Sequence, residues 1–227
     1  MVTRIRSGGP HHGQAVLHYG VPLGADRAVG ILVHGRGASA EDILDLAQHL
    51  KSTDVTWLAP QAAGHTWYPN RFIAPIESNE PWLTSGLDAV GDIVAQVMAA
   101  GVPARRILIG GFSQGACLAL EFVLRNPARY GGVAGLSGGL IGPAGTRWPE
   151  LGSLDGMPVF LGCSDVDDHI PKERVRESAA VLRRMGGTVT DILYPGMGHT
   201  VNQDELQHVQ ALVDDLTQGL SDHRPSI

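Results

Sequence analysis

The sequence predicts an α/β fold, in which a mostly parallel sheet carries helices on both faces. Short apolar runs alternate along the chain with longer stretches of helical periodicity, and this alternation is typical of parallel sheets. The runs, such as residues 28–33, are apolar without interruption, as expected of strands that are covered on both faces. Clusters of reactive side chains follow several runs directly, at the strand ends where ligands bind in such folds.

The elements follow one another in a regular order. The predicted strands cover residues 14–19 (an edge strand), 28–33, 55–59, 107–109, 133–136, 158–163 and 188–194. The predicted helices cover residues 41–50, 81–100, 116–124, 172–185 and 203–219. Pro81 suits the first position of its helix and Gly101 suits the stop after it. Segments 61–80 and 138–156 keep no sustained period and are predicted as loops.

The composition fits a single domain over residues 1–227, with a core over about 14–220 and flexible termini. A chain of 227 residues buries roughly 70% of its unfolded surface, and 43% hydrophobic with 18% charged residues is ordinary for a globular protein. A net charge of −6 argues against a nucleic-acid partner, and no basic run indicates a membrane surface. We find no apolar targeting or spanning stretch and expect a cytoplasmic location. The oligomeric state stays open.

Residues 111–115, Gly-Phe-Ser-Gln-Gly, join an apolar run to an apolar helical stretch. Strand, G-x-S-x-G and helix in this order form the context of a nucleophile elbow, a turn so sharp that the serine backbone is strained. Glycines at Gly111 and Gly115 remove the Cβ atoms that would collide with the flanking strand and helix. The predicted nucleophile is therefore Ser113.

The same pattern occurs a second time around Ser137. Its upstream half fits a strand, but Gly138, Gly139, Gly142 and Pro143 forbid an immediate helix. Ser137 is accordingly predicted as a loop residue at a strand end.

His199 is the predicted general base. A serine hydroxyl needs a histidine to accept its proton and a carboxylate to orient that histidine. Among ten histidines, only His199 lies in a glycine-rich loop between the last predicted strand and the last predicted helix. Candidate carboxylates stand at Asp165, Asp167 and Asp168, which gives the chain order Ser…Asp…His of the α/β-hydrolases.

The same acids, with His169 beside them, are crowded enough to suggest a cation site. No second ligand cluster of matching type occurs in the sequence, so we expect no metal and no cofactor. Cys117 and Cys163 lie in apolar company and are expected as small core residues.

Residues 34–37, His-Gly-Arg-Gly, follow the strand whose loop supplies one oxyanion donor in such enzymes. Their glycines let the backbone approach a substrate. The backbone N–H groups of Arg36 and Gln114 are the predicted oxyanion pair. The alternative is that residues 34–37 are only a turn.

Together these motifs resemble the phospholipase/carboxylesterase and acyl-protein thioesterase family of α/β-hydrolases. The resemblance rests on residues 33–37, 111–115, 165–171 and 196–199 and spans about 29–216. It implies a compact α/β-hydrolase fold without a separate lid domain. It also implies cleavage of carboxylic esters or thioesters without metal or cofactor.

One segment departs from the family pattern. The family often has His-Gly-Asp-x-Asp-Pro where this chain has Cys163-Ser164-Asp165-Val166-Asp167-Asp168. Aligning Asp165 and Asp167 on the family's Asp-x-Asp, with Pro171 on its downstream proline, implies that Asp167 orients His199. Asp165 is the alternative acid, or it holds the turn together by accepting backbone N–H bonds.

The loop 61–80 should fold near the mouth of the site. Its aromatic residues are predicted to line an acyl pocket, with local core packing as an equal alternative. These residues are Trp67, Tyr68, Phe72 and the neighbouring Trp82. The side chains of Arg36 and Arg71 could attract a carboxylate, although solvation or pairing with Glu77 or Glu80 is the favoured interpretation.

These observations predict a serine carboxylesterase that cleaves small to medium acyl esters through an acyl-enzyme on Ser113. Its expected partner is a small-molecule ester or thioester. Within the family, an acyl-protein thioesterase or a lysophospholipase is the alternative. From a different class, the alternative is a non-catalytic ligand-binding protein on the same scaffold. A cysteine nucleophile conflicts with serine at the elbow, since Cys117 falls inside the following helix.

Overall fold

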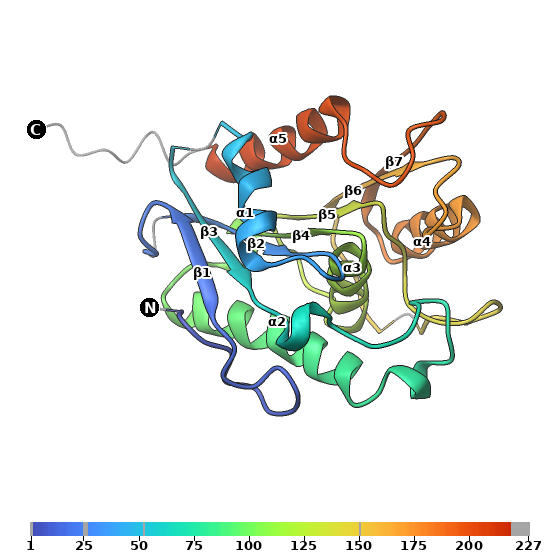
Figure 1. Ribbon diagram of the computed structural model, residues 1–227. Coiled ribbons are helices and arrows are strands. Elements are labelled where there is room, and N and C mark those ends of the chain that lie inside the picture. The colour runs from blue at the N-terminus through green and yellow to red at the C-terminus, as the bar shows by residue number, and fades with distance from the viewer. Residues whose placement is uncertain (1, 25–26, 52, 150, 219–227) are drawn as a thin grey trace, which may run out of the picture.

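In the computed structural model, the protein is described over residues 2–24, 27–51, 53–149 and 151–218. Its centre is a seven-stranded sheet with the order β1-β3-β2-β4-β5-β6-β7 (Figure 1). Strand β1 pairs antiparallel with β3, and all other neighbours are parallel. The strands are β1 (Val16–Gly20), β2 (Ala28–Val33), β3 (Val55–Pro60), β4 (Ile107–Phe112), β5 (Gly132–Leu136), β6 (Pro158–Ser164) and β7 (Thr188–Tyr194).

Helices connect the parallel strands. The α-helices are α1 (Ala40–Gln48), α2 (Trp82–Ala99), α3 (Gln114–Arg125), α4 (Lys172–Arg184) and α5 (Gln203–Thr217). Short 3₁₀ turns occur at Ala63–His65, Ile76–Asn79 and Ala104–Arg106. Two α-helices start with a capping box, in which Ser39 caps α1 and Asn202 caps α5.

The α-helices cover both faces of the sheet. Helices α1 and α5 lie on one face and α2, α3 and α4 on the other (Figure 1). Strand β2 shows why the strands are apolar without interruption. Val29 and Ile31 belong to the core that α2 and α3 share, whereas Ala28 and Leu32 belong to the core under α1 and α5. A polar residue at any of these positions would lose its hydration on one face or the other.

The predicted fold class is confirmed. Every predicted strand and helix is present, with ends shifted by at most three residues. The largest shift is in β4, which continues through the glycines to Phe112 and so delivers the chain directly into the elbow. The predicted end of the last helix, residue 219, lies outside the described residues. Across the described ranges, no helix is long and apolar enough to cross a membrane.

The prediction of a flexible N-terminal segment is wrong. Val2 and Ile5 are 2% and 1% exposed and belong to the core, and Arg4 forms a bridge with Ala15. His11 is fully buried, and its ring bonds to the carbonyl oxygen of Trp67 at 3.0 Å. Apolar residues spaced three apart in an otherwise polar stretch were too sparse to reveal this packing. The predicted flexible C-terminus, residues 221–227, lies outside the described residues.

Candidate active site

The turn between β4 and α3 holds Ser113 in a strained backbone conformation. Its φ is 55° and its ψ is −119°, a region that non-glycine residues rarely occupy. A Cβ on Gly115 would lie 2.0 Å from the carbonyl oxygen of Val33, and one on Gly111 would lie 2.5 Å from the same oxygen. Both glycines are therefore required by close approach, as the sequence predicted. In this conformation the Ser113 hydroxyl reaches the imidazole of His199.

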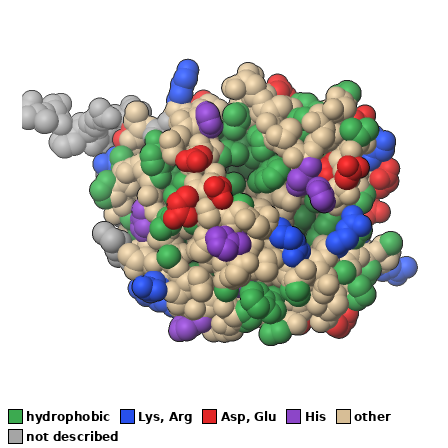
Figure 2. All heavy atoms as spheres, in the orientation of Figure 1, with side chains coloured by type: hydrophobic (Ala, Val, Ile, Leu, Met, Phe, Trp, Pro, Cys, Tyr) green, Lys and Arg blue, Asp and Glu red, His purple; other side chains and the backbone are tan. Residues whose placement is uncertain are grey.

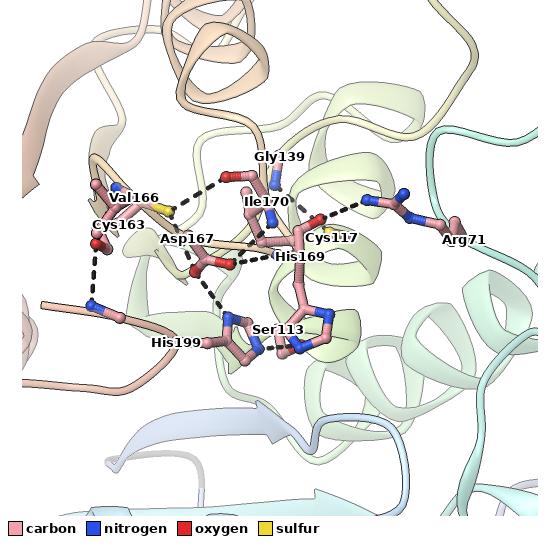
Figure 3. Close-up of polar contacts among 12 residues, drawn as sticks. Arg71, Ser113, Cys117, Gly139, Cys163, Val166, Asp167, His169, Ile170 and His199 are labelled. Carbon is pink, nitrogen blue, oxygen red and sulfur yellow. Dashed lines mark hydrogen bonds and ion pairs between the residues drawn. The ribbon is translucent and has the colours of Figure 1, made fainter. Parts of the chain in front are cut away.

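Ser113, His199 and Asp167 form a continuous chain of hydrogen bonds (Figure 3). The oxygen Oγ of Ser113 lies 2.8 Å from Nε2 of His199, and Nδ1 of His199 lies 2.7 Å from Oδ2 of Asp167. Because a carboxylate only accepts, Nδ1 carries the proton and Nε2 is free to accept from the serine hydroxyl. The structure thus brings together the three residues that the sequence singled out, and it selects Asp167 as the partner of His199.

The loop after β6 fixes the Asp167 carboxylate. Its side chain is fully buried, and Oδ1 accepts hydrogen bonds from the backbone N–H groups of His169 at 2.8 Å and Ile170 at 2.9 Å. Burial alone would raise the pKa of this carboxyl, but the hydrogen bonds from His199 and the two N–H groups outweigh burial and lower it. Asp167 is therefore an anion at neutral pH. The Cys163 thiol lies 3.7 Å from Oδ2, and burial raises its pKa to about 12.

Asp165 has a different task. Its Oδ1 accepts a hydrogen bond from the backbone N–H of Gly196 at 2.8 Å, and the neighbouring Ser164 Oγ accepts from Gly198 at 3.1 Å. Both bonds tie the loop after β6 to the loop that carries His199. The alternative interpretation of Asp165, as an acceptor of backbone N–H groups that holds the turn, is the one that the geometry supports.

Two aromatic rings flank the His199 imidazole. The Phe112 ring centroid lies 4.9 Å from that of His199, and the His169 ring meets it edge-on at 4.7 Å. These contacts restrict the rotation of the imidazole that the hydrogen bonds already orient.

The predicted oxyanion donors lie at the same end of the sheet. The backbone N–H of Gln114 is the first of α3, and that of Arg36 lies in the turn after β2. Within the described residues, neither N–H group donates to another protein atom. His34 stabilises the turn, since Nδ1 donates to the Gly35 carbonyl at 2.7 Å and Nε2 accepts from Ala62 at 3.0 Å. Burial lowers the pKa of His34, which keeps this imidazole neutral.

The Gln114 side chain binds the loop 61–80. Its Oε1 accepts from the backbone N–H of Trp67 at 2.8 Å, and its Nε2 donates to the Tyr68 carbonyl at 2.8 Å. One residue therefore offers its backbone N–H to the site and positions the loop beside it with its side chain.

A pocket of about 620 Å³ opens over Ser113, within the range of ligand sites. Of the aromatic residues predicted to line it, Tyr68 and Phe72 do so. The prediction is wrong for Trp67 and Trp82. Trp67 is fully buried with its indole N–H on the His34 carbonyl at 3.0 Å, and Trp82 packs on the core with its ring against His11. Both indole rings, one in the loop 61–80 and one at the start of α2, pack in the core, which is the alternative that the sequence left open.

Several further lining residues were not identified from the sequence as part of the pocket. They include Phe112, Cys117, His169 and Ile170. A signal existed for Cys117, because a residue four positions after Ser113 on a helix lies on the same face one turn later. Phe112 is the variable residue inside the G-x-S-x-G motif, and the motif assigns no role to that position.

The two arginines near the site are not paired with Glu77 or Glu80 in the described structure. The Arg36 guanidinium donates to Thr66 Oγ1 at 3.0 Å and to the carbonyls of Pro69 and Asn70 at 2.9 and 2.6 Å. Arg71 is exposed at the pocket and reaches the His169 carbonyl at 3.4 Å (Figure 3). The expectation of solvation or acidic partners therefore holds for Arg71 only as solvation, since its side chain is exposed. For Arg36 it is corrected, because carbonyl oxygens of the loop 61–80 accept from the guanidinium.

Ser137 lies directly after β5, and no helix follows it. It is fully buried, and it is not among the residues that line the pocket over Ser113. Among the described residues, no group of three or more His, Cys, Asp or Glu side chains is arranged to hold a metal ion.

The sheet order and the strand–elbow–helix unit around Ser113 define the fold as that of an α/β-hydrolase. A model of the phospholipase/carboxylesterase family matches residues 22–216, and the chain belongs to this family of hydrolases. A solved phospholipase/carboxylesterase from Dyadobacter fermentans DSM 18053 is 40% identical, covers 89% of this chain and 97% of its own, and superposes with a TM-score of 0.83.

Curated relatives carry the name acyl-protein thioesterase 1. The protein from Eremothecium gossypii is 27% identical over 81% of this chain and 85% of its own length. The protein from Gibberella zeae is 33% identical, but the match covers 54% of this chain and about half, 53%, of that protein.

Proposed function

We propose that this protein is a serine esterase that hydrolyses small to medium acyl esters through an acyl-enzyme on Ser113. The observation that carries the proposal is the hydrogen-bonded chain from Ser113 through His199 to Asp167, at 2.8 and 2.7 Å. Nucleophile and base at this separation, with the base oriented by a buried carboxylate, are what serine hydrolysis requires.

The first half of the reaction transfers the acyl group. As Ser113 Oγ attacks the carbonyl carbon, its proton moves to Nε2 of His199. The carbonyl oxygen becomes an oxyanion facing the backbone N–H groups of Arg36 and Gln114. The Asp167 carboxylate stabilises the imidazolium. His199 then protonates the leaving alcohol, the C–O bond to it breaks, and the acyl-enzyme remains.

The second half repeats these roles with water. His199 takes a proton from a water molecule, whose oxygen attacks the acyl carbon, and the collapse of the second oxyanion returns the proton to Ser113 Oγ. The carboxylic acid leaves. A site of this kind needs no cofactor for any of these proton transfers.

Thioester hydrolysis is the second candidate. It is supported by the similarity to acyl-protein thioesterase 1 of Eremothecium gossypii over 81% of this chain. The same residues would act, because a thiolate is a better leaving group than an alkoxide and relies less on protonation by His199. A lysophospholipase differs from the esterase only in the alcohol that leaves.

A matched substrate panel decides among these candidates. We expect p-nitrophenyl esters of increasing acyl length and the corresponding acyl-CoA thioesters to be cleaved by the native protein and not by Ser113→Ala. Higher kcat/KM on the esters supports the esterase, and the reverse order assigns a thioesterase. Turnover of neither series by correctly folded protein would refute catalysis and leave the ligand-binding alternative.

A further inference from the structure

A second cavity of about 310 Å³ adjoins the site on the other side of His199. Four residues line both this cavity and the pocket over Ser113: Gly35, Ala38, Phe112 and His199. The wall that the second cavity does not share with the first has three apolar side chains, Ile43, Leu46 and Val201, and three polar ones, His34, Asp42 and Thr200. Figure 2 shows a hollow beside hydrophobic side chains, with acidic side chains on one side and histidine side chains on the other; basic side chains lie farther away, beyond the histidines. We call the second cavity the α1 cavity.

The geometry of the triad decides which half of an ester enters the α1 cavity. Ser113 and Gln114 line the pocket over the elbow and not the α1 cavity, so the carbonyl group sits in the elbow pocket. The leaving oxygen must receive the proton of His199, and His199 lines both spaces. A leaving alcohol that accepts this proton can extend past the imidazole and Phe112 into the α1 cavity. The acyl chain stays with Tyr68 and Phe72.

The charges around the α1 cavity restrict what it accepts. Asp42 lines it and lies in the first turn of α1 beside exposed Glu41. Hydrogen bonds from the Ser39 hydroxyl and backbone N–H lower the pKa of Asp42, so its carboxylate is ionised at neutral pH. His34, which also lines the cavity, is kept neutral by burial and does not offset this charge. Arg36 and Arg71, the two arginines near the site, line the pocket over Ser113 and are not among the residues that line the α1 cavity.

We propose that the α1 cavity binds the alcohol half of the substrate, and that it selects apolar, uncharged alcohols over anionic leaving groups. This inference rests on the proposed function and deepens it. It assigns the acyl chain to the pocket over Ser113 and the alcohol to the α1 cavity, on opposite sides of the side chains of His199 and Phe112 that line both spaces. It predicts poor reaction of leaving groups that place a phosphate or carboxylate inside the α1 cavity, close to Asp42.

The test varies one half of the substrate at a time. With the acyl group fixed, kcat/KM of the native protein is measured for ethyl, butyl and hexyl acetate. With the alcohol fixed, it is measured for ethyl acetate, butyrate and hexanoate. The quantity kcat/KM covers the steps up to release of the alcohol, so the common acetyl-enzyme does not mask differences among the alcohols.

Leu46→Trp fills the α1 cavity, and Leu23→Trp is the matched control. Both leucines are half-buried and line surface cavities, but Leu23 lies away from the triad. We expect Leu46→Trp to lower the hexyl-to-ethyl acetate ratio by about tenfold, which corresponds to about two methylene groups losing their contacts. It should leave the hexanoate-to-acetate ratio as in Leu23→Trp. Val201→Phe fills the cavity from its other wall and should give the same pattern if Leu46→Trp fails to fold.

The charge is tested with an anionic alcohol. The substrate is the acetate ester of 6-hydroxyhexanoate, compared with hexyl acetate. Asp42→Asn should raise the ratio of anionic to neutral substrate about two- to fivefold, as expected for an exposed charge in high dielectric. Asp88→Asn, which removes an exposed charge on α2, should leave this ratio unchanged.

Failure of this inference is distinct from failure of the proposed function. If Ser113-dependent hydrolysis is present but the ratio among the alcohols does not respond to Leu46→Trp and Val201→Phe, the α1 cavity is not the alcohol site. If those variants lower the ratio among the acyl chains instead, the assignment of the two halves is reversed. If the native protein hydrolyses no ester or thioester at all, the proposed function itself is refuted.

Discussion

Replacing Asp167 by asparagine should disable the site without altering its shape. Oδ1 of Asp167 accepts from the N–H groups of His169 and Ile170, and Oδ2 accepts from Nδ1 of His199. Because two backbone donors face one position, the asparagine oxygen takes that position and its NH₂ group faces His199. That NH₂ group donates, so Nδ1 must accept and the imidazole proton moves to Nε2. A protonated Nε2 cannot accept the proton of Ser113.

The size of the loss in kcat follows from the two orientations that the asparagine amide can take. The opposite orientation would face NH₂ against two backbone donors in a fully buried place, at about 1–3 kcal/mol for each unsatisfied group. The side chain therefore keeps the inactive tautomer of His199. In serine hydrolases this change of tautomer lowers kcat by about 10⁴-fold. At 1.36 kcal/mol per factor of ten, the barrier rises by about 5 kcal/mol.

Hydrolysis of p-nitrophenyl acetate measures the effect, with Asp165→Asn as the matched control. An asparagine oxygen at position 165 still accepts from the Gly196 N–H, so kcat should stay within a few-fold and the cost should be mainly stability, about 1 kcal/mol. Circular dichroism and thermal unfolding establish that both variants fold. The reasoning is refuted if Asp165→Asn is folded and inactive while Asp167→Asn retains near-native kcat.

Three further predictions concern the elbow, a buried acid and metal ions. Gly115→Ala should lower the unfolding free energy by several kcal/mol, because the new Cβ would lie 2.0 Å from the Val33 carbonyl oxygen. Gly8→Ala, which meets nothing within 4 Å, is its control in thermal unfolding, and equal stability of the two would contradict the account. Burial raises the pKa of Glu205 to about 7 from 4.5. The contribution of this carboxyl to folding stability is therefore most favourable below pH 4.5 and is lost as the pH rises through 7. The free energy of unfolding of Glu205→Gln, relative to that of the native protein, should therefore increase by about 3 kcal/mol between pH 4.5 and 8.5 in denaturant titrations. A difference between the two proteins that does not change with pH would contradict this prediction. EDTA should leave esterase activity unchanged, since His199 moves every proton; loss that a divalent ion restores would overturn this expectation.

The sequence was sufficient where the determinants are local. Each buried parallel strand is a short apolar run, and the elbow requires glycines at Gly111 and Gly115 whatever surrounds it. The position of His199 could be predicted for a similar reason. The chain order Ser…Asp…His and the end of the last strand determine which loop can carry the general base. The choice of Asp167 needed the family resemblance, and the contact at 2.7 Å then supported it.

The parts that could not be predicted depend on partners far away in the chain. Trp67 turns into the core because its indole N–H finds the His34 carbonyl, a contact between different loops. Arg36 satisfies its guanidinium on the carbonyls of Pro69 and Asn70, which no pattern of charged residues indicates. The N-terminal segment packs because Ile5 and its neighbours find apolar surface on α2 and the sheet. Hydrophobic periodicity predicts which face of a helix or strand is buried, but not which part of the chain packs against that face.

The most direct test of an activated Ser113 is its reaction with a fluorophosphonate probe. A serine hydroxyl that is deprotonated by His199 attacks phosphorus as it attacks a carbonyl carbon. Intact-mass spectrometry with peptide mapping should find one adduct per native chain, on Ser113. Ser113→Ala should fold and remain unlabelled, and Ser137→Ala should be labelled like the native protein. An adduct on Ser137, or labelling undiminished in Ser113→Ala, would contradict the account.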